Sequence, residues 1–259
     1  MRIRRYIKLA EALLGLALSA TPRAANANSG LWVGDIVVER VNRPGPASAT
    51  WDTTTNLLAA NTFNFRAIIH VDTNGQARLL QRVLLAFSHN AGQATNAITG
   101  QVTTNGTYRL LSDESLVAGV RKTDPQAEIT RLSSVNFPLM APQALNGQFG
   151  PGQTLVGTVT VPYDNPVNPF VHVYAPLHDN LRIQNAVTNK LLNGVESYTV
   201  TRSLTFQFAT QDPSNATNPR WGVDENGGDF RETIEGLYRP VQVQGRFRVQ
   251  RLTTIGQLD

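Results

Sequence analysis

Apolar and polar residues alternate with a period of two along most of the chain after residue 27, which is the pattern of β-strands with one buried face. The longest such run extends from Val195 to Ala209, and its apolar face is interrupted by Arg202. Residues 63–89 alternate in the same way around Asn74-Gly75, a dipeptide that suits the positive φ angles of a tight hairpin turn. These runs predict antiparallel strands joined by short turns.

The other strand signals are spread over the whole chain and leave little room for helices. Residues 90–107 and 211–228 are polar and predict long loops, and Asp113–Val117 is compatible with one helical turn or a short strand. No repeat of fixed period is present, which is unlike a propeller or a solenoid. We therefore expect an all-β, mostly antiparallel β-sandwich of the jelly-roll type. Its further strands are expected at Leu31–Val41, Ile129–Leu132, Ser134–Leu139, Leu155–Val161, Phe230–Leu237 and Val241–Leu252.

The N-terminus has the pattern of a secretory signal peptide. A basic stretch precedes an apolar run at 9–20, and Ala25-Asn26-Ala27 places small residues where a signal peptidase cleaves. The run is shorter than the roughly 20 residues of a spanning helix, and no later segment is long enough. We expect a signal peptide at 1–27 and one domain at 28–259, with a single candidate subdivision near 141–153. The predicted location is secreted or cell-surface.

Charge and cysteine content narrow the classes of partner. The chain has 23 basic and 19 acidic residues, and removal of 1–27 leaves 18 of each. A nucleic-acid partner is therefore not expected, because such binding needs a net basic surface. The chain has no cysteine, which excludes disulfides and thiolate chemistry and favours a bacterial exported protein.

Several segments together are similar to a known class of module. They are residues 30–34, 70–83, 168–181, 194–202 and 227–237, the last reading Gly-Gly-Asp-Phe-Arg-Glu-Thr-Ile-Glu-Gly-Leu. The chain resembles uncharacterised modules of large bacterial secreted and surface proteins, which accompany laminin-G-like (concanavalin-type) sandwich domains. The resemblance implies an extracellular β-module, and it implies no reaction. The neutral net charge of residues 28–259 and the Thr- and Gln-rich strand faces separately favour a structural or adhesive role.

Residues 164–181 combine metal-ligand side chains with rigid prolines more densely than any other segment. His172, His178 and Asp179 offer nitrogen and oxygen ligands, and Asp164 adds a carboxylate. The oxygen-rich set suits calcium better than zinc, whose recognised ligand spacings are absent. Turn formation by Asp and Asn beside proline is the alternative explanation of this composition.

Carbohydrate binding is a further hypothesis, because aromatic side chains in polar loops can stack on sugars. Trp51 and Trp221 lie in polar loops, and Tyr174 lies in the candidate metal segment, whereas Trp32 falls in an apolar strand and is expected in the core. The expected partners are extracellular glycans or other surface proteins. In the adhesive alternative, strand 195–209 lies at a sheet edge and pairs with another chain. The charges of Arg202, Arg246 and Arg248 would then protect the exposed edge against unspecific pairing.

A secreted hydrolase is the remaining alternative. His70-Val71-Asp72 and His178-Asp179 are reminiscent of a catalytic triad, but the Gly-x-Ser-x-Gly elbow is absent. Carboxylates between Asp224 and Glu235 provide candidate pairs for glycoside hydrolysis. Among them Glu232 is adjacent to Arg231, which favours a surface ion pair. No catalytic residue is therefore assigned.

Overall fold

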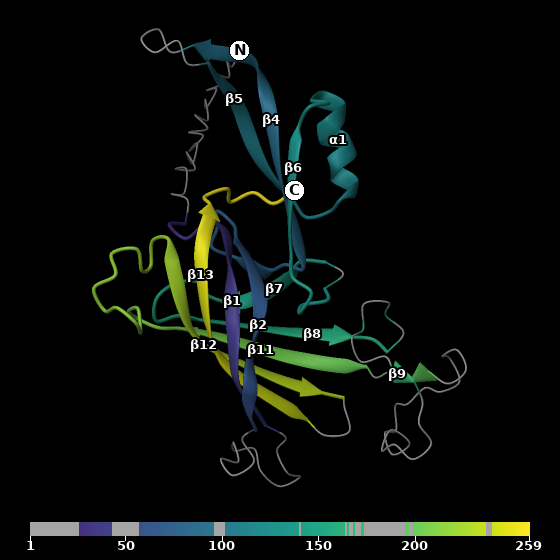
Figure 1. The fold of residues 1–259 in the computed structure, drawn as a ribbon, viewed down its shortest axis with the longest axis vertical. Helices are drawn as coiled ribbons and strands as arrows, with labels where there is room; N and C mark the ends of the chain where they lie inside the picture. Colours follow the sequence, from purple (N-terminus) through teal and green to yellow (C-terminus); the bar gives the residue numbers. More distant parts are fainter. Residues whose placement is uncertain are drawn as a thin grey trace, which may run out of the picture.

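The computed structural model describes residues 26–42, 57–95, 102–139, 141–163, 165, 168, 172–173, 195–196, 199–236 and 240–259. Eight antiparallel strands close into a barrel, and a smaller three-stranded sheet with one helix extends from one end of it (Figure 1). In ring order the barrel strands are β1 (Gly30–Asn42), β13 (Val241–Thr253), β12 (Glu225–Glu235), β11 (Val200–Phe208), β8 (Thr154–Val161), β7 (Gln143–Gly147), β3 (Ala77–Leu79) and β2 (Leu57–Val71).

The all-β prediction is confirmed, but the predicted β-sandwich of the jelly-roll type is wrong. β1 pairs with β2 along one side and with β13 along the other, so the first and last strands of the domain close the ring. Alternation shows which face of a strand is buried but not which strands pair, and it is the same in a sandwich and in a barrel. Strand β11, which the adhesive alternative places at a sheet edge, lies between β8 and β12.

Side chains fill the inside of the barrel. β8 alternates strictly between exposed and buried residues, as the sequence predicted for 155–161. Close ring contacts join the aromatic residues of the core, with centroid distances of 4.7–5.3 Å in the series Trp32, Phe149, Phe208, Phe247, Phe206 and Phe230. Gly245 lies where the backbones approach, since a Cβ there would be 2.1 Å from the Val37 carbonyl oxygen. The interior of the barrel is thus a core of packed side chains.

The short strands β3 and β7 are supplemented by an irregular segment, residues 134–139, which we call the strap. The sequence predicted a strand here. Instead, Ser134 donates from its backbone N–H to Gln81 (2.7 Å) and from its hydroxyl to the Arg66 carbonyl (2.6 Å). Phe137 is buried in the barrel core, with its ring 6.3 Å from that of Phe65 on β2. The strap therefore contributes to the core without adding a strand to the ring.

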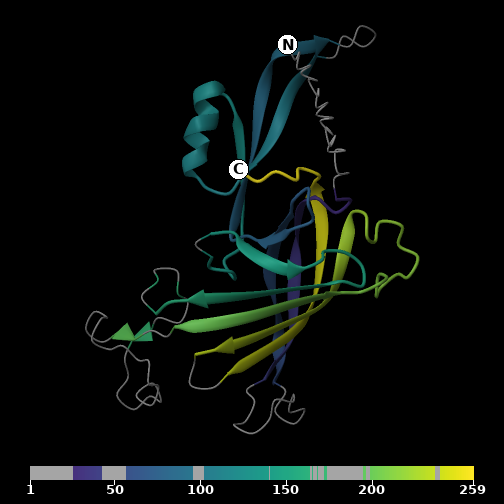
Figure 2. The ribbon, with the colours of Figure 1, turned by 180° about the vertical axis from the view of Figure 1, so that it is seen from behind.

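The smaller sheet, here called the arm, has the strand order β5 (Val102–Leu111), β4 (Arg82–Thr95) and β6 (Glu128–Ser133). Helix α1 (Ser115–Thr123) packs against one face through Val120, which contacts the cluster of Leu84, Ala86 and Leu111 (Figure 2). The base of the other face packs on the barrel through Leu31 and Ile68. Residues 90–95 and 102–107 belong to strands, so the loop predicted over 90–107 is wrong there.

Candidate functional site

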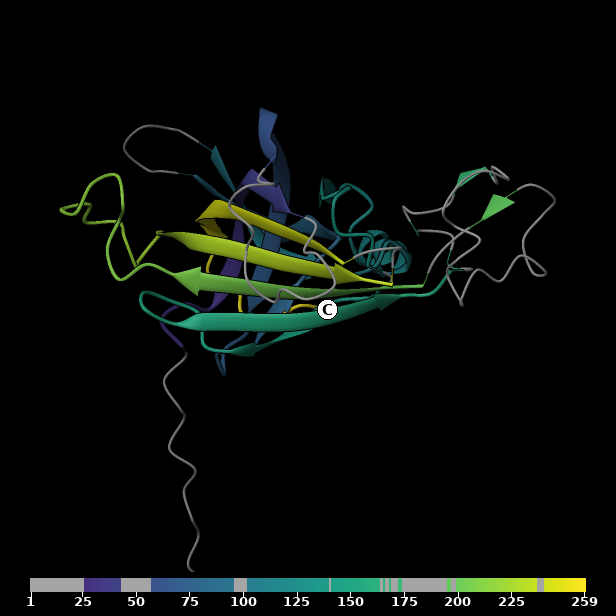
Figure 3. The same cartoon turned by 90° about the horizontal axis from the view of Figure 1, so that it is seen from below.

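The connection from β11 to β12, residues 209–224, is a polar loop organised by its own side chains. Carboxylate and amide oxygens accept hydrogen bonds from backbone N–H groups two residues later: Asp212 from Ser214 (2.8 Å), Asn215 from Thr217 (3.2 Å) and Asn218 from Arg220 (3.0 Å). Such bonds stabilise turns without regular structure. The loop projects on the opposite side of the barrel from β9 (His172–Val173) and β10 (Val195–Glu196) (Figure 3).

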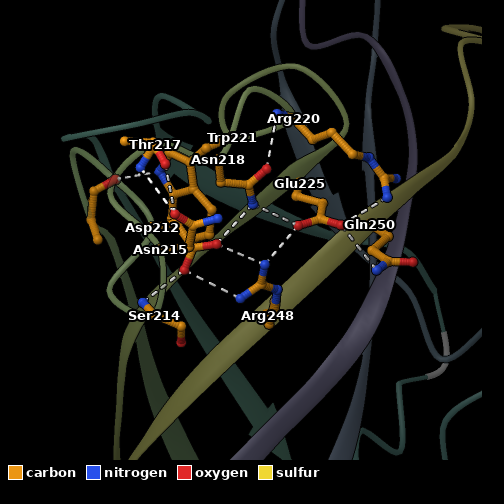
Figure 4. Close-up of polar contacts among 11 residues, drawn as sticks. Asp212, Ser214, Asn215, Thr217, Asn218, Arg220, Trp221, Glu225, Arg248 and Gln250 are labelled. Carbon is orange, nitrogen blue, oxygen red and sulfur yellow. Dashed lines mark hydrogen bonds and ion pairs between the residues drawn. The ribbon is translucent and has the colours of Figure 1, made fainter.

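Arg248 on β13 fastens this loop to the outer wall of the barrel (Figure 4). Its guanidinium donates to both oxygens of Asp212, at 2.8 and 3.3 Å, and to Glu225 at 2.6 Å. The Asn218 amide bridges the same two carboxylates at 2.7 and 3.0 Å. Arg220 and Gln250 complete the coordination of Glu225 at 3.1 and 3.3 Å. We call this group of six residues the outer cluster.

The outer cluster keeps its carboxylates ionised. The Asn218 amide, the Ser214 N–H and the Arg248 guanidinium lower the pKa of Asp212 to about 2. Arg248 and Asn218 also lower the pKa of Glu225, and the two carboxylates raise the pKa of Arg248. Hydrogen bonds that are made only to the charged form cause these shifts. The loop is therefore held by charges that persist across the whole neutral and mildly acidic range.

Trp221 lies near the end of the loop, and its ring position is fixed on several sides. The indole N–H donates to the Ala209 carbonyl at 3.2 Å, and the Arg248 guanidinium lies 5.6 Å from the ring centroid. A Cβ on Gly227 would lie 3.2 Å from the ring, so this glycine allows the indole to lie close over β12. A ring held in this way loses little conformational freedom when a ligand stacks on it.

An open groove of about 460 Å³ runs along the outer wall beside this ring, and we call it the Trp221 groove. Strand β1 supplies Val33, Asp35 and Val37, whose side chains alternate with the buried Trp32 and Ile36. Strand β13 and the loop supply Arg246, Phe247, Arg248, Gln250, Pro213, Ser214 and Trp221, and Gly34 and Gly228 complete the lining. The groove thus combines an indole and aliphatic surface with hydrogen-bonding groups of both kinds.

Asp35 is the charged residue of the groove whose carboxylate has no ion-pair partner among the described residues. It lies opposite Arg248 in the β1–β13 register. The Arg248 guanidinium nevertheless bonds the outer cluster, while Arg246 pairs with Glu39 at 3.2 Å. Among the described residues, the Asp35 carboxylate forms no ion pair or side-chain hydrogen bond. It is therefore available to accept hydrogen bonds from a ligand.

Of the predicted ligand-binding aromatic residues, Trp221 belongs to this groove, and Trp32 is fully buried in the core as predicted. Trp51, Tyr174, Asp164, His178 and Asp179 lie outside the described residues, and His172 belongs to β9 but its side chain is not described. Calcium binding by 164–181 therefore stays a prediction. Among the described residues, no group of three or more His, Cys, Asp or Glu side chains could hold a metal.

The segment that contains Trp51 and the segment that contains residues 164–181 connect strands whose ends lie at the same end of the barrel. β1 ends at Asn42, where β2 begins, and Val161 of β8 pairs with Val200 of β11 at the same level of the ring. The registers of β11 with β12, of β12 with β13 and of β13 with β1 show that these strand ends lie at the same height along the barrel. The Trp221 groove adjoins the far ends of β11 and β12, so Trp221 is separated from the strand ends that flank both segments.

The sequence did not identify the outer cluster. Arg246 and Arg248 were interpreted as charges that protect an exposed edge, but β13 pairs on both sides, with β1 and with β12. Asp212 and Asn218 were part of an unspecified polar loop. Two signals were present in the sequence: Asp and Asn residues that form turns within the loop, and Gly227-Gly228 after Trp221. Neither signal indicates which distant strand supplies the arginine.

Glu232 also differs from its prediction, because it lies inside the barrel and not at the surface. Its side chain is 1% exposed and pairs with Arg202, the charged residue on the apolar face of β11. Arg202 also donates to the Asn136 carbonyl of the strap at 2.9 Å and lies over the Phe137 ring at 5.1 Å. Its predicted role at a free edge is therefore wrong, and it tethers the strap to the barrel core.

Comparison with known proteins finds no matching family model, no matching curated protein and no matching solved structure. The resemblance to modules that accompany laminin-G-like domains therefore stays a prediction. Within the described part of the chain, no helix has the length and apolar character needed to cross a membrane.

Proposed function

We propose that this protein is an exported, non-catalytic binding module that takes a carbohydrate ligand in the Trp221 groove. The observation that carries the proposal is the fixed indole of Trp221 beside an open groove with both apolar and hydrogen-bonding walls. A sugar ring has an apolar C–H face that stacks on an aromatic ring, and hydroxyl groups around its rim that donate and accept hydrogen bonds. The N-terminal signal pattern supports an extracellular setting for such a ligand.

The charges of the groove favour a neutral saccharide over an anionic one. Both arginines of the groove already have carboxylate partners, since Arg248 bonds Asp212 and Glu225 and Arg246 pairs with Glu39. The Asp35 carboxylate also repels an acidic group. Asp35, Ser214 and Gln250 can bond uncharged hydroxyls, and Val33 and Val37 provide apolar contact.

The test is a glycan screen of the protein without residues 1–27, followed by calorimetric titration with the best neutral oligosaccharide. We expect Trp221→Ala to weaken binding at least about tenfold, because stacking on the indole contributes roughly 1.5 kcal/mol. Asp35→Asn keeps the side-chain shape and is expected to weaken binding less. Val223→Ala is the matched control, since Val223 is an exposed residue of the same loop and does not line the groove.

Circular dichroism and thermal melting of each variant separate loss of binding from loss of folding. A neutral glycan that binds Trp221→Ala as well as the native protein contradicts the groove as the site. A screen in which acidic glycans bind and neutral ones do not contradicts the ligand class. No binding to any glycan contradicts the proposed function itself.

A further inference from the structure

The arm sheet ends in two different edge strands. Its order is β5–β4–β6, so β5 and β6 each pair with β4 on one side only. The backbone N–H and C=O groups on the outer side of an edge strand are a template for pairing with another strand, and proteins usually protect such edges with charged residues.

β6 is protected in this way, and β5 is not. Within six residues β6 carries Glu128 and Arg131, and Arg131 pairs with Glu114 at 2.8 Å. Over its ten residues β5 contains a single charged residue, Arg109. Both Nε and Nη2 of Arg109 donate to the same Asp259 oxygen, at 2.9 and 2.8 Å, so its charge is neutralised within the chain. The side chains of β5 therefore bring no unpaired charge to this edge.

The C-terminus covers one end of the β5 edge and reveals which residues face outward. Asp259 donates to the Leu110 carbonyl at 2.9 Å and accepts from the Ser112 N–H at 2.8 Å. Leu110 and Ser112 thus direct their backbone groups away from β4. Because this direction alternates along an antiparallel strand, Tyr108 and Gly106 face outward as well. Thr104 and Val102 follow the same alternation, since the register shift beyond Gly106 inserts its extra residues in β4 and not in β5. Among the described residues, no strand pairs with the outer side of this 102–108 stretch.

We propose that the 102–108 edge of β5 pairs antiparallel with the same edge of a second copy, joining two arms into one continuous sheet. Two strands related by a twofold axis are antiparallel, so one edge can pair with itself in an isologous contact. Outward-facing residues on both sides make about eight backbone hydrogen bonds. The β5 edge has no unpaired charged side chain to desolvate on pairing, whereas self-pairing of β6 would bring Glu128 and Arg131 into the contact.

Exposed aromatic side chains add apolar contact beside this edge. Tyr108 is 53% exposed, and its ring lies 4.7 Å from that of Phe87 on β4. The Phe87 ring lies over Gly106, where a Cβ would be 2.0 Å from it. The pair forms on the face opposite α1. When all four outward residues pair, Tyr108 lies opposite residue 102 of the second copy, so each exposed ring covers the beginning of the partner strand. Desolvation of the ring favours the paired state.

The dimer contact does not depend on the proposed saccharide binding, but it has a consequence for that binding. Dimerisation through the arms places two Trp221 grooves in one particle, because the groove lies on the barrel and not on the arm. Simultaneous binding at both grooves raises the apparent affinity for a repetitive ligand without any new contact to it.

The experiment is sedimentation velocity over a concentration series of the protein without residues 1–27. We expect a dimer whose dissociation constant rises at least about tenfold in Thr104→Pro, which removes an outward N–H but no bond to β4. Tyr108→Lys is expected to weaken the dimer similarly by placing a charge on the edge. Thr130→Lys on β6 is the matched control and is expected to leave the dimer intact.

Hydrogen exchange supplies a second readout. Backbone amides of Thr104, Gly106 and Tyr108 should be protected at high protein concentration and exposed at low concentration. A native protein that stays monomeric at every concentration overturns the proposal. A dimer that persists in both β5 variants, or that is lost in Thr130→Lys, also overturns it. Thermal melting confirms that each variant is folded, and glycan binding is measured separately at the same concentrations.

Discussion

Arg202 and Arg248 both bond a glutamate of β12, but they do so on opposite sides of the barrel wall. Arg202 and Glu232 face inward, with side chains 8% and 1% exposed. Arg248 and Glu225 face outward, and the Arg248 side chain is 44% exposed. Both arginines also hold an irregular segment, the strap in one case and the 209–224 loop in the other.

The two sites differ in how completely their polar atoms are bonded. Asp212 and Glu225 accept hydrogen bonds at all four carboxylate oxygens. Glu232 Oε2 is buried and accepts none within the described structure. A buried ion pair carries a desolvation cost that solvent lowers at the outer site. The comparison teaches that the inner pair fixes the packing of the strap at a cost in stability, whereas the outer cluster fixes a loop at little cost.

Breaking the inner pair should have the largest effect. Arg202→Met leaves Glu232 as an unpaired buried charge, and we expect a loss of about 3–5 kcal/mol in the free energy of unfolding at pH 7. Urea denaturation measures it. The double variant Arg202→Met, Glu232→Leu removes both charges and should recover most of the loss, because an apolar pair of similar volume avoids the desolvation cost. A double variant as unstable as the single one contradicts this account.

Breaking the outer cluster should cost less. Arg248→Ala is expected to lower the free energy of unfolding by about 1 kcal/mol, since water can solvate the partners that it leaves. Limited proteolysis should cleave within 209–224 faster, because the loop loses its main tether. Arg246→Ala is the matched control on the same strand, where an exposed pair with Glu39 contributes well under about 1 kcal/mol. Equal effects of the two variants would contradict the special role of Arg248.

Acid should release the outer cluster only at low pH. The folded-state pKa of Asp212 is about 2, below the ordinary value of 3.8, so its contribution to stability is present above pH 3.8 and is lost as pH falls through about 2. Glu225 shifts in the same direction. The indole N–H resonance of Trp221, assigned with Trp221→Phe, should therefore keep its position from pH 7 to 4 and change below. A midpoint near pH 4 would contradict the arrangement of hydrogen-bond donors around Asp212.

A rise in salt concentration should have the smallest effect on stability, and it should distinguish the exposed outer cluster from the buried inner pair. Raising ionic strength screens solvent-exposed charges more than buried ones. The stability difference between native protein and Arg248→Ala should therefore shrink in 1 M NaCl, by roughly half, whereas the difference for Arg202→Met should stay nearly constant. Urea denaturation at both salt concentrations measures the two differences. A large salt dependence of the inner pair would indicate that it is solvated.

Local patterns predicted most of the strands correctly, but they did not predict to which sheet each strand belongs. The turn at Asn74-Gly75 and strand β8 lie where alternation and turn chemistry place them, because neighbouring residues decide both. The alternating run over 63–89 predicts a single partner strand for β2 after that turn. In the structure it divides into β3 of the barrel and β4 of the arm, since burial in two different cores is not visible in one alternating run.

The sequence by itself determined that the protein is built from antiparallel strands, which faces of those strands are apolar, and that Trp32 is core whereas Trp221 lies in a polar loop. Only the tertiary structure decided that β1 meets β13 to close a barrel, that Arg202 finds Glu232 inside it, and that Arg248 gathers Asp212 and Glu225 outside it. The physical reason is that period-two burial is a local property of each strand. Strand pairing and charge pairing instead join residues distant in the chain, and many pairings satisfy the same local pattern.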